Sequence, residues 1–173
     1  VKTNSLFADL ENDNTAVVSY GRHVQNLDSA SGLPDTITQA VQRQDIDFSA
    51  DGDDEWQTLY PKTNRQDKVR FRPISNKNLT LFENENISTI PGQEMYSVIY
   101  DLPVAVSGGV GGLFGTVDGE LELRNLRLCG VQAVSDTTAT SSVGALAGEV
   151  QGKLNVIGCE TYLSRSRGHL DDA

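Results

Sequence analysis

The chain has 173 residues, of which 14 are Lys or Arg and 24 are Asp or Glu, so its formal net charge at pH 7 is −10. A surface that acidic repels phosphate backbones and anionic lipid head groups, which argues against nucleic acid and bare membrane as partners. The length suits one domain with a proper core. Two cysteines are too few for a disulfide framework or a four-ligand zinc site, and we expect no cofactor.

The chain does not begin with Met, and it reads as a piece of a longer protein. Its longest apolar stretch, residues 97–117, is rich in glycine and is interrupted by Asp101 and Pro103. Because a membrane-spanning helix needs about 20 mostly apolar residues in a row, we expect no membrane insertion. No leader or lipid-anchor motif is visible either. We therefore expect a monomeric fragment whose export signal or anchor lies outside it.

Residues 1–17 are expected to form a lead-in segment, and the first predicted element follows them. Val24 and Leu27 lie at helical spacing within residues 20–27, which predicts a short helix. A helix laid across one end of a stacked β structure covers strand edges that are otherwise open. We therefore predict that this segment is an N-terminal capping helix.

The next stretches alternate between apolar and polar residues in short runs, which is typical of β-strands. Residues 36–48 alternate in part, with Ile37, Val41, Ile46 and Phe48 as the inward-facing candidates. Further short strands between polar turns are suggested by Val69, Phe71, Leu79, Leu81, Ile87, Ile90, Val98 and Ile99. The sequence thus predicts an all-β chain after the helix.

An acidic loop at residues 51–55 is the best candidate for a cation site. Asp51, Asp53, Asp54 and Glu55 could supply several of the six to eight oxygens that calcium takes. The loop lacks the twelve-residue pattern that ends in a bidentate Glu. A solvated acidic loop without metal is therefore the preferred interpretation, and no metal site is expected.

The strongest signal is an internal repeat in the second half of the chain. Residues 110–123 recur as residues 143–156, at an offset of 33. The apolar positions recur, and the glycines recur with them: Gly111, Gly115 and Gly119 correspond to Gly144, Gly148 and Gly152. Repeats of about 20–50 residues are typical of solenoids, propellers and arrays.

The local pattern within each repeat distinguishes these architectures. Leu121 and Leu123 alternate with charged residues, and the alternation resumes at Leu126 with its parity shifted by one. A bend between two short strands produces such a shift. Asn125 lies at the bend, and Gly158 has the same place in the second copy. Both residue types tolerate the left-handed backbone that a tight bend can require.

Stacked coils would carry equivalent residues about 4.8 Å apart. We predict three stacked pairs: Leu121 on Leu154, Leu123 on Val156, and Glu120 beside Lys153 as a favourable charge pair. The polar residues 135–142 are predicted to be a loop that lengthens one coil. The prediction is a parallel β-solenoid over residues 18–163 with a polar tail at 164–173. A two-repeat β-sandwich of glycine-turn hairpins is the alternative.

The repeat also resembles a known family. Gly111-Gly-Leu-Phe-Gly-Thr-Val, followed after Gly119 by Leu123-Arg-Asn-Leu-Arg-Leu, is similar to the GLUG-type repeat. Val143-Gly-Ala-Leu-Ala-Gly, followed by Val156-Ile-Gly-Cys, is similar to it as well. That repeat occurs in Gram-positive bacterial surface adhesins and in proteins associated with immunoglobulin A peptidases. The resemblance implies a right-handed parallel β-helix on a secreted or wall-bound protein.

The region before the repeats resembles the module that commonly precedes them. There a short helix, a strand, a Trp and a Pro-containing turn follow one another. Here these are residues 20–27, Ala40-Val-Gln-Arg-Gln-Asp-Ile-Asp-Phe, Trp56 and Arg72-Pro-Ile-Ser. Two departures are visible. Ser75 replaces the expected Gly, and the second repeat lacks the usual second Gly and bulky residue, so loops and packing can differ there.

Few residues carry the pattern of a catalytic site. Glu120 and Glu122 would point outward about 6.6 Å apart, close to the spacing of an inverting glycosidase, but Lys153 is a neighbour and no aromatic platform accompanies them. A salt-bridged surface ladder is preferred. His23 and His169 lie in no metal or nucleophile motif. No catalytic residue is therefore expected.

The two cysteines are predicted not to pair. Cys159 takes the repeat position of the inward Leu126, whereas Cys129 lies three residues further along the first copy. Three residues are about 10 Å along a strand, and a disulfide needs Cα atoms within about 7 Å. We expect Cys159 to be a small buried residue.

These patterns favour a non-enzymatic module of a bacterial cell-surface or secreted protein, acting in adhesion or as a structural spacer. Its partner would be an extracellular ligand, a glycan or a host protein. Two alternatives stay open: a carbohydrate-active β-helix enzyme, and an accessory domain of a secreted peptidase. Fold alone does not decide function, so this choice depends on the missing chemistry and on the resemblance.

Overall fold

The computed structural model describes residues 9–12, 14–28, 33–48, 71–106, 109–134 and 141–163. Its elements in chain order are β1 (Asp9–Asn12), β2 (Thr15–Val18), α1 (Gly21–Asn26), β3 (Gln39–Gln42), β4 (Ile46–Asp47), β5 (Leu81–Asn84), β6 (Ile99–Tyr100), β7 (Pro103–Ala105), β8 (Val110–Gly111), β9 (Phe114–Val117), β10 (Glu120–Arg124), β11 (Arg127–Cys129), β12 (Gln132–Val134), β13 (Ser142–Val143), β14 (Ala147–Val150), β15 (Lys153–Ile157) and β16 (Glu160–Tyr162). The described part is all-β apart from α1, as the sequence predicted.

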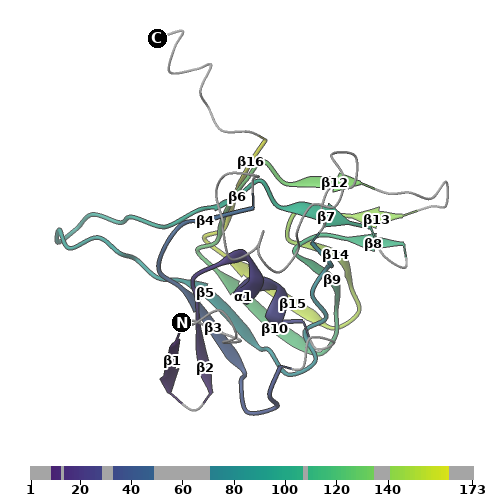
Figure 1. The fold of residues 1–173 in the computed structure, drawn as a ribbon, viewed down its shortest axis with the longest axis horizontal. Helices are drawn as coiled ribbons and strands as arrows, with labels where there is room; N and C mark the ends of the chain where they lie inside the picture. The colour runs from purple at the N-terminus through teal and green to yellow at the C-terminus, as the bar shows by residue number, and fades with distance from the viewer. Residues whose placement is uncertain are drawn as a thin grey trace, which may run out of the picture.

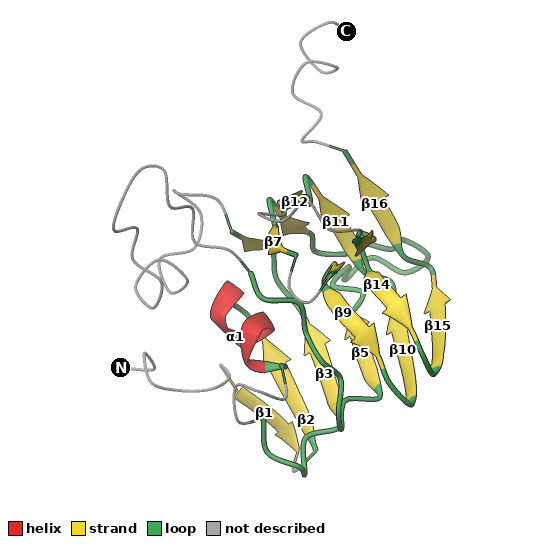
Figure 2. Cartoon of the chain, turned by 90° about the vertical axis from the view of Figure 1, so that its right-hand side faces the viewer, coloured by secondary structure: helices red, strands yellow, loops and turns green. Residues whose placement is uncertain are grey.

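Two sheets contain most of the strands. The larger has the order β1-β2-β3-β5-β10-β15 and is parallel throughout, except that β1 runs antiparallel to β2. The smaller has the order β16-β11-β6-β4 and is parallel throughout. Three further parallel pairs join β7 with β12, β8 with β13, and β9 with β14. Figures 1 and 2 show how the short strands line up side by side.

The two repeats lie directly on each other. We call residues 110–134 the inner pass and residues 142–163 the outer pass. Leu121 pairs with Leu154 and Leu123 with Val156 in the parallel β10–β15 ladder. These pairings confirm the predicted stacking and exclude antiparallel hairpins for the repeats. The offset of 33 holds at β9, β10 and β11, whereas β13 is shifted by one.

The bend between the two strands of each pass is built as predicted. Asn125 has a φ of 59° and Gly158 a φ of 64°, so both lie in the left-handed region. Gly152 meets a different need. A Cβ atom at that position would collide with the main-chain oxygen of Gly119 in the pass below, so only glycine fits.

One continuous apolar core lies inside the stack. Its largest members include Phe71, Phe82 and Phe114, all fully buried, and Phe48 packs edge-on against Phe71 with ring centroids 5.6 Å apart. The predicted inward residues Ile37, Val41, Ile46 and Phe48 are buried. Each large side chain removed from water contributes roughly 1.5–3 kcal/mol, so these side chains are the main favourable term for the fold.

Helix α1 closes the end of the core near the N-terminus, where the capping helix was predicted (Figure 2). A six-residue helix is too short to be stable alone, so tertiary contacts must hold it. Val24 and Leu27 are fully buried in the core. The Gln25 side chain donates to the main-chain oxygen of Arg72 at 2.9 Å and accepts from its N–H at 2.8 Å.

Two predicted strand residues lie elsewhere. Ile87 and Ile90 are 38% and 55% exposed and belong to the long connection between β5 and β6, not to a strand. The prediction for them is wrong because the chain leaves the stack there, and their apolar spacing does not face the core. Phe71, Leu79 and Ile99 from the same set are buried as expected.

The opposite end of the stack is open. Val117 and Leu123 of the inner pass are fully buried, whereas their equivalents Val150 and Val156 of the outer pass are 46% and 48% exposed. Other exposed apolar residues of this pass are Val143, Ile157, Tyr162 and Leu163. β15 forms the last strand of the larger sheet in the described chain.

Candidate functional site

The connection between β5 and β6 is the described segment that departs most from the repeats. The inner pass joins β10 to β11 through Asn125 and Leu126, and the outer pass uses Gly158 and Cys159 at the same corner. Between β5 and β6 this corner is replaced by residues 85–98, which we call the arm. Figure 1 shows the arm as the teal loop that extends far from the sheets.

The base of the arm is fixed to strands on both sides. The Asp45 carboxylate accepts from the N–H of Val98 at 2.8 Å, beside β4. Arg43 and Glu85 form an ion pair at 2.6 Å. On the other side, the Arg127 guanidinium of β11 lies over the ring of Tyr96, 4.8 Å from its centroid. The arm therefore leaves the body in a defined direction.

The outer part of the arm is ordered by its own hydrogen bonds. Ile90-Pro-Gly-Gln forms a turn in which the N–H of Gln93 donates to the oxygen of Ile90 at 3.1 Å, and Gly92 has a φ of 77°. Proline followed by glycine with positive φ is the signature of a type II turn. The Asn86 side-chain oxygen accepts from the N–H groups of Ser88 and Met95, both at 3.0 Å.

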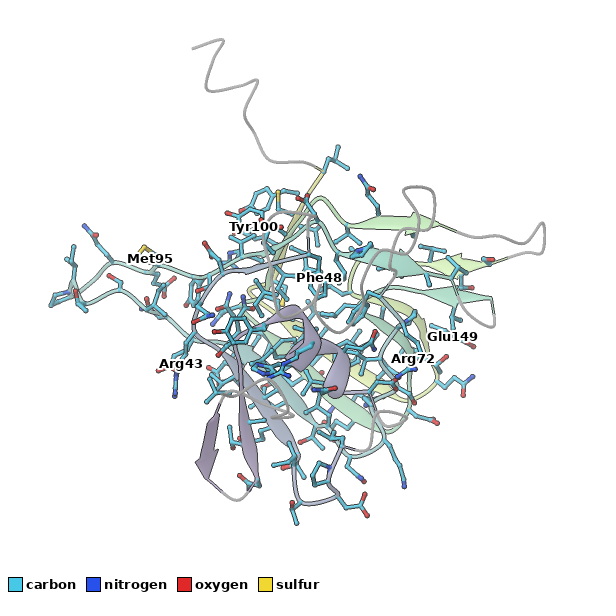
Figure 3. All side chains as sticks on the ribbon, in the orientation of Figure 1. Arg43, Phe48, Arg72, Met95, Tyr100 and Glu149 are labelled. Atoms are coloured by element: carbon cyan, nitrogen blue, oxygen red, sulfur yellow. The ribbon has the colours of Figure 1, made fainter. Side chains whose placement is uncertain are left out.

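This ordered arm carries apolar side chains outward. Ile90 and Met95 are both 55% exposed and Ile87 is 38% exposed, and Figure 3 shows Met95 on the arm away from the body. Burying such a side chain against a partner contributes roughly 1.5–3 kcal/mol. Because the arm is already ordered, binding pays less conformational entropy than a flexible loop would. The arrangement suits contact with an apolar surface of another molecule.

A cleft of about 260 Å³ lies between α1 and the stack, lined in part by Asp28, Arg72, Ser75 and Thr116. The buried Asp28 carboxylate accepts from Arg72 Nε at 2.6 Å and from the N–H of Ser75 at 3.1 Å. Both carboxylate oxygens are thus used to hold the segment after residue 71 against the helix. The polar groups of the cleft are engaged in structure, which makes it a weaker candidate than the arm.

The paired carboxylates of β10 form a surface ladder. Glu120 pairs with Lys153 at 3.0 Å across the two passes, and Glu122 pairs with Arg124 on the same strand. Each carboxylate has a cationic partner, as the preferred interpretation of the sequence predicted. Such pairing holds a carboxylate in its ionised form and does not suit a general acid.

His23 lies in α1 and is fully buried. Its Nδ1 accepts from the N–H of Ser19 at 3.2 Å, and its ring packs edge-on against Tyr20. Burial, with a smaller effect of the neighbouring Arg22 charge, lowers the pKa of His23 from 6.5 to about 4. The ring is therefore neutral near pH 7 and acts as a packing residue under α1.

The remaining predicted site residues divide into two groups. The acidic loop with Asp51, Asp53, Asp54 and Glu55 lies outside the described residues, and so does His169. Across the described ranges, no three His, Cys, Asp or Glu side chains form a group that could hold a metal ion. The six repeat glycines all lie in the two stacked passes, where they have the structural role expected for them.

The cysteines do not form a disulfide with each other. Cys159 follows the bend as predicted, but it is only partly buried, because the outer pass has no strand above it in the described chain. Its Sγ contacts the Leu123 oxygen at 3.4 Å, and burial raises its pKa. Cys129 is the buried member of the two.

Sequence reasoning missed the arm as a site, although one signal was present. Pro91-Gly92 is a strong turn marker, and it interrupts the apolar run that was assigned to strands. The exposure of Ile87, Ile90 and Met95 could not be read from that marker. It depends on where the chain leaves the stack, which the sequence pattern does not specify.

Comparison with known proteins found no match to any family model, to any curated protein or to any solved structure. In the ranges that the structure covers, no helix is both long and apolar enough to cross a membrane.

Proposed function

We propose that this chain is a non-enzymatic module of a bacterial cell-surface or secreted protein, in which a right-handed parallel β-helix carries the arm outward for adhesion. The parallel ladders support the scaffold. Strands of the two passes pair in sequence order with a constant offset at β9, β10 and β11, which is how successive coils of a β-helix stack. Right-handed crossovers between parallel strands are the strong rule.

The ordered arm is the observation that favours adhesion over a purely structural spacer. A spacer needs only the stack, and an exposed aliphatic loop would add a risk of aggregation without benefit. Here Asn86 and the turn at Pro91-Gly92 hold Ile87, Ile90 and Met95 outward, while Asp45 and Arg127 fix the base. Ordered exposure of this kind is typical of contact surfaces.

The test is binding of the soluble chain to arrays of extracellular host proteins and glycans. We expect a bound target whose signal falls at least about tenfold for Ile90→Asp, since a carboxylate at the centre of an apolar contact is costly to desolvate. Gln132→Asp is the matched control, because it adds the same charge on exposed β12 away from the arm. We expect it to bind as the parent does.

Two results would contradict the proposal. Binding that survives Ile90→Asp and Met95→Asp together would remove the arm from the contact. A chain that binds no array component would favour the spacer role. Turnover of a polysaccharide, lost in Glu122→Gln, would support the enzyme alternative.

A further inference from the structure

The open end of the stack has the properties of an unfinished sheet. β15 pairs with β10 on one side, and in the described chain no strand lies on its other side. The inward-facing Val156 of this strand is 48% exposed, while Leu123, which it covers, is fully buried. A strand edge combined with exposed apolar side chains is a template for pairing with another chain.

The direction of the main-chain groups on β15 follows from two hydrogen bonds. The N–H of Lys153 donates to the oxygen of Gly119 at 2.6 Å, and the oxygen of Ile157 accepts from the N–H of Asn125 at 2.8 Å. Alternate residues of a strand present their N–H and C=O groups to opposite edges. Residues 153, 155 and 157 therefore face β10, and the main-chain groups of Leu154 and Val156 face the open edge.

We propose that two copies of this chain pair through β15, antiparallel, about a two-fold axis at Asn155. In that register Leu154 of one copy lies opposite Val156 of the other. Both residues present their N–H and C=O groups to the edge, so each such pair exchanges two hydrogen bonds. The same register brings the inward-facing side chains of Leu154 and Val156 together on one face of the joined sheet.

The other end of the stack explains why the partner is the same end of a second copy. There β1 runs antiparallel to β2 at the sheet edge, and α1 packs its Val24 and Leu27 into the core. A head-to-tail contact would have to displace this cover. Pairing of like ends uses one patch on both chains and closes after two copies, which is the commonest symmetry of protein dimers.

Charge also permits this contact. The whole chain has a net charge of −10, which opposes self-association in general. The outer pass is different: its charged residues are Glu149, Lys153 and Glu160. Lys153 lies on β15 itself, so the joined strands bring one lysine from each copy and no carboxylate. The dimer replaces the monomer expected from the sequence, where the open end was not visible.

The experiment is sedimentation equilibrium of the intact chain from about 1 to about 200 µM, a range that covers moderate dimer affinities. We expect a monomer–dimer equilibrium. Val156→Lys should raise the dimer dissociation constant at least about tenfold, because it places a charge in the apolar contact. Val156→Pro removes only an N–H that faces the open edge, and it should weaken the dimer without breaking the β10–β15 ladder.

Ile90→Lys is the matched control. It places the same charge at a side chain of similar exposure on the arm, far from the open end, and the dimer should persist. Circular dichroism of each variant reports whether it is folded. A parent chain that stays monomeric at the highest concentration would overturn the proposal. A dimer lost in Ile90→Lys but kept in both Val156 variants would also overturn it, by placing the contact on the arm.

Discussion

The inner and outer passes have the same pattern of apolar residues and glycines, yet they differ in burial. Leu123 and Val117 are fully buried, and their equivalents Val156 and Val150 are about half exposed. The residues of a repeat specify which face points inward. The neighbouring pass then decides how much water that face loses, so equivalent positions contribute unequally to stability.

The largest expected effect separates the two passes at equivalent core positions. Leu123→Ala should lower the free energy of unfolding by about 2–5 kcal/mol, because it leaves a cavity between two layers. Val156→Ala should cost less than about 1 kcal/mol, since that side chain is already half in water. Urea denaturation at low protein concentration measures both. Equal losses would show that the outer pass is covered in solution.

The next effect concerns the capped end, which the open end lacks. The pKa of His23 is about 4 in the folded chain and near 6.5 when unfolded, so the unfolded state binds more protons between these values. The stabilising effect is complete above pH 6.5 and is lost as the pH falls toward 4, by up to about 3 kcal/mol. Denaturation at several pH values, compared with His23→Gln, isolates it. The slope of that difference should vanish above pH 7.

A smaller effect distinguishes equivalent glycines in the two passes. Gly152→Ala forces a Cβ atom against the main-chain oxygen of Gly119 and should cost about 1–3 kcal/mol. Gly119→Ala meets no atom within 4 Å and pays only for its positive φ, about 1 kcal/mol. Thermal melts of both variants rank the two costs. A reversed order would mean that the passes are not in close contact at this corner.

The smallest effect is expected at the charge pair that joins the passes. Glu120 and Lys153 are 3.0 Å apart, with side chains 63% and 65% exposed. Solvent screens exposed pairs, so their coupling in a double-mutant cycle should be at most about 0.5 kcal/mol and should fall with added salt. A coupling above about 1 kcal/mol would indicate a less hydrated contact than the exposure suggests.

The stacked strands could be predicted because a repeat specifies its own register. Once Leu121 and Leu154 are recognised as equivalent, the pairing of Leu123 with Val156 and the bend at Asn125 follow from strand geometry. The capping helix was also visible, from the spacing of Val24 and Leu27. These features depend on local pattern and on copies of the same pattern.

The arm and the open end could not be predicted, because each depends on what the chain does not cover. Ile87 and Ile90 have the spacing of strand residues, and only the geometry shows that they leave the stack. Val156 looks as inward as Leu123 in sequence. The contact of Gln25 with Arg72 joins residues that are 47 apart and share no pattern. The acidic loop at residues 51–55 stays a prediction.

The parallel ladders also determine how the chain must fold. The β2–β3 ladder joins residues 24 apart, as in Thr15 with Gln39, and the β5–β10 ladder joins Leu81 to Glu122. Apart from β1–β2, the pairings of the two sheets are therefore non-local, and loop closure precedes most of the stabilising contacts. High contact order of this kind is associated with folding in milliseconds to seconds or slower. Helix α1 can dock only after the segment around Arg72 is in place, so the cap should be the last part to protect its amide hydrogens during refolding.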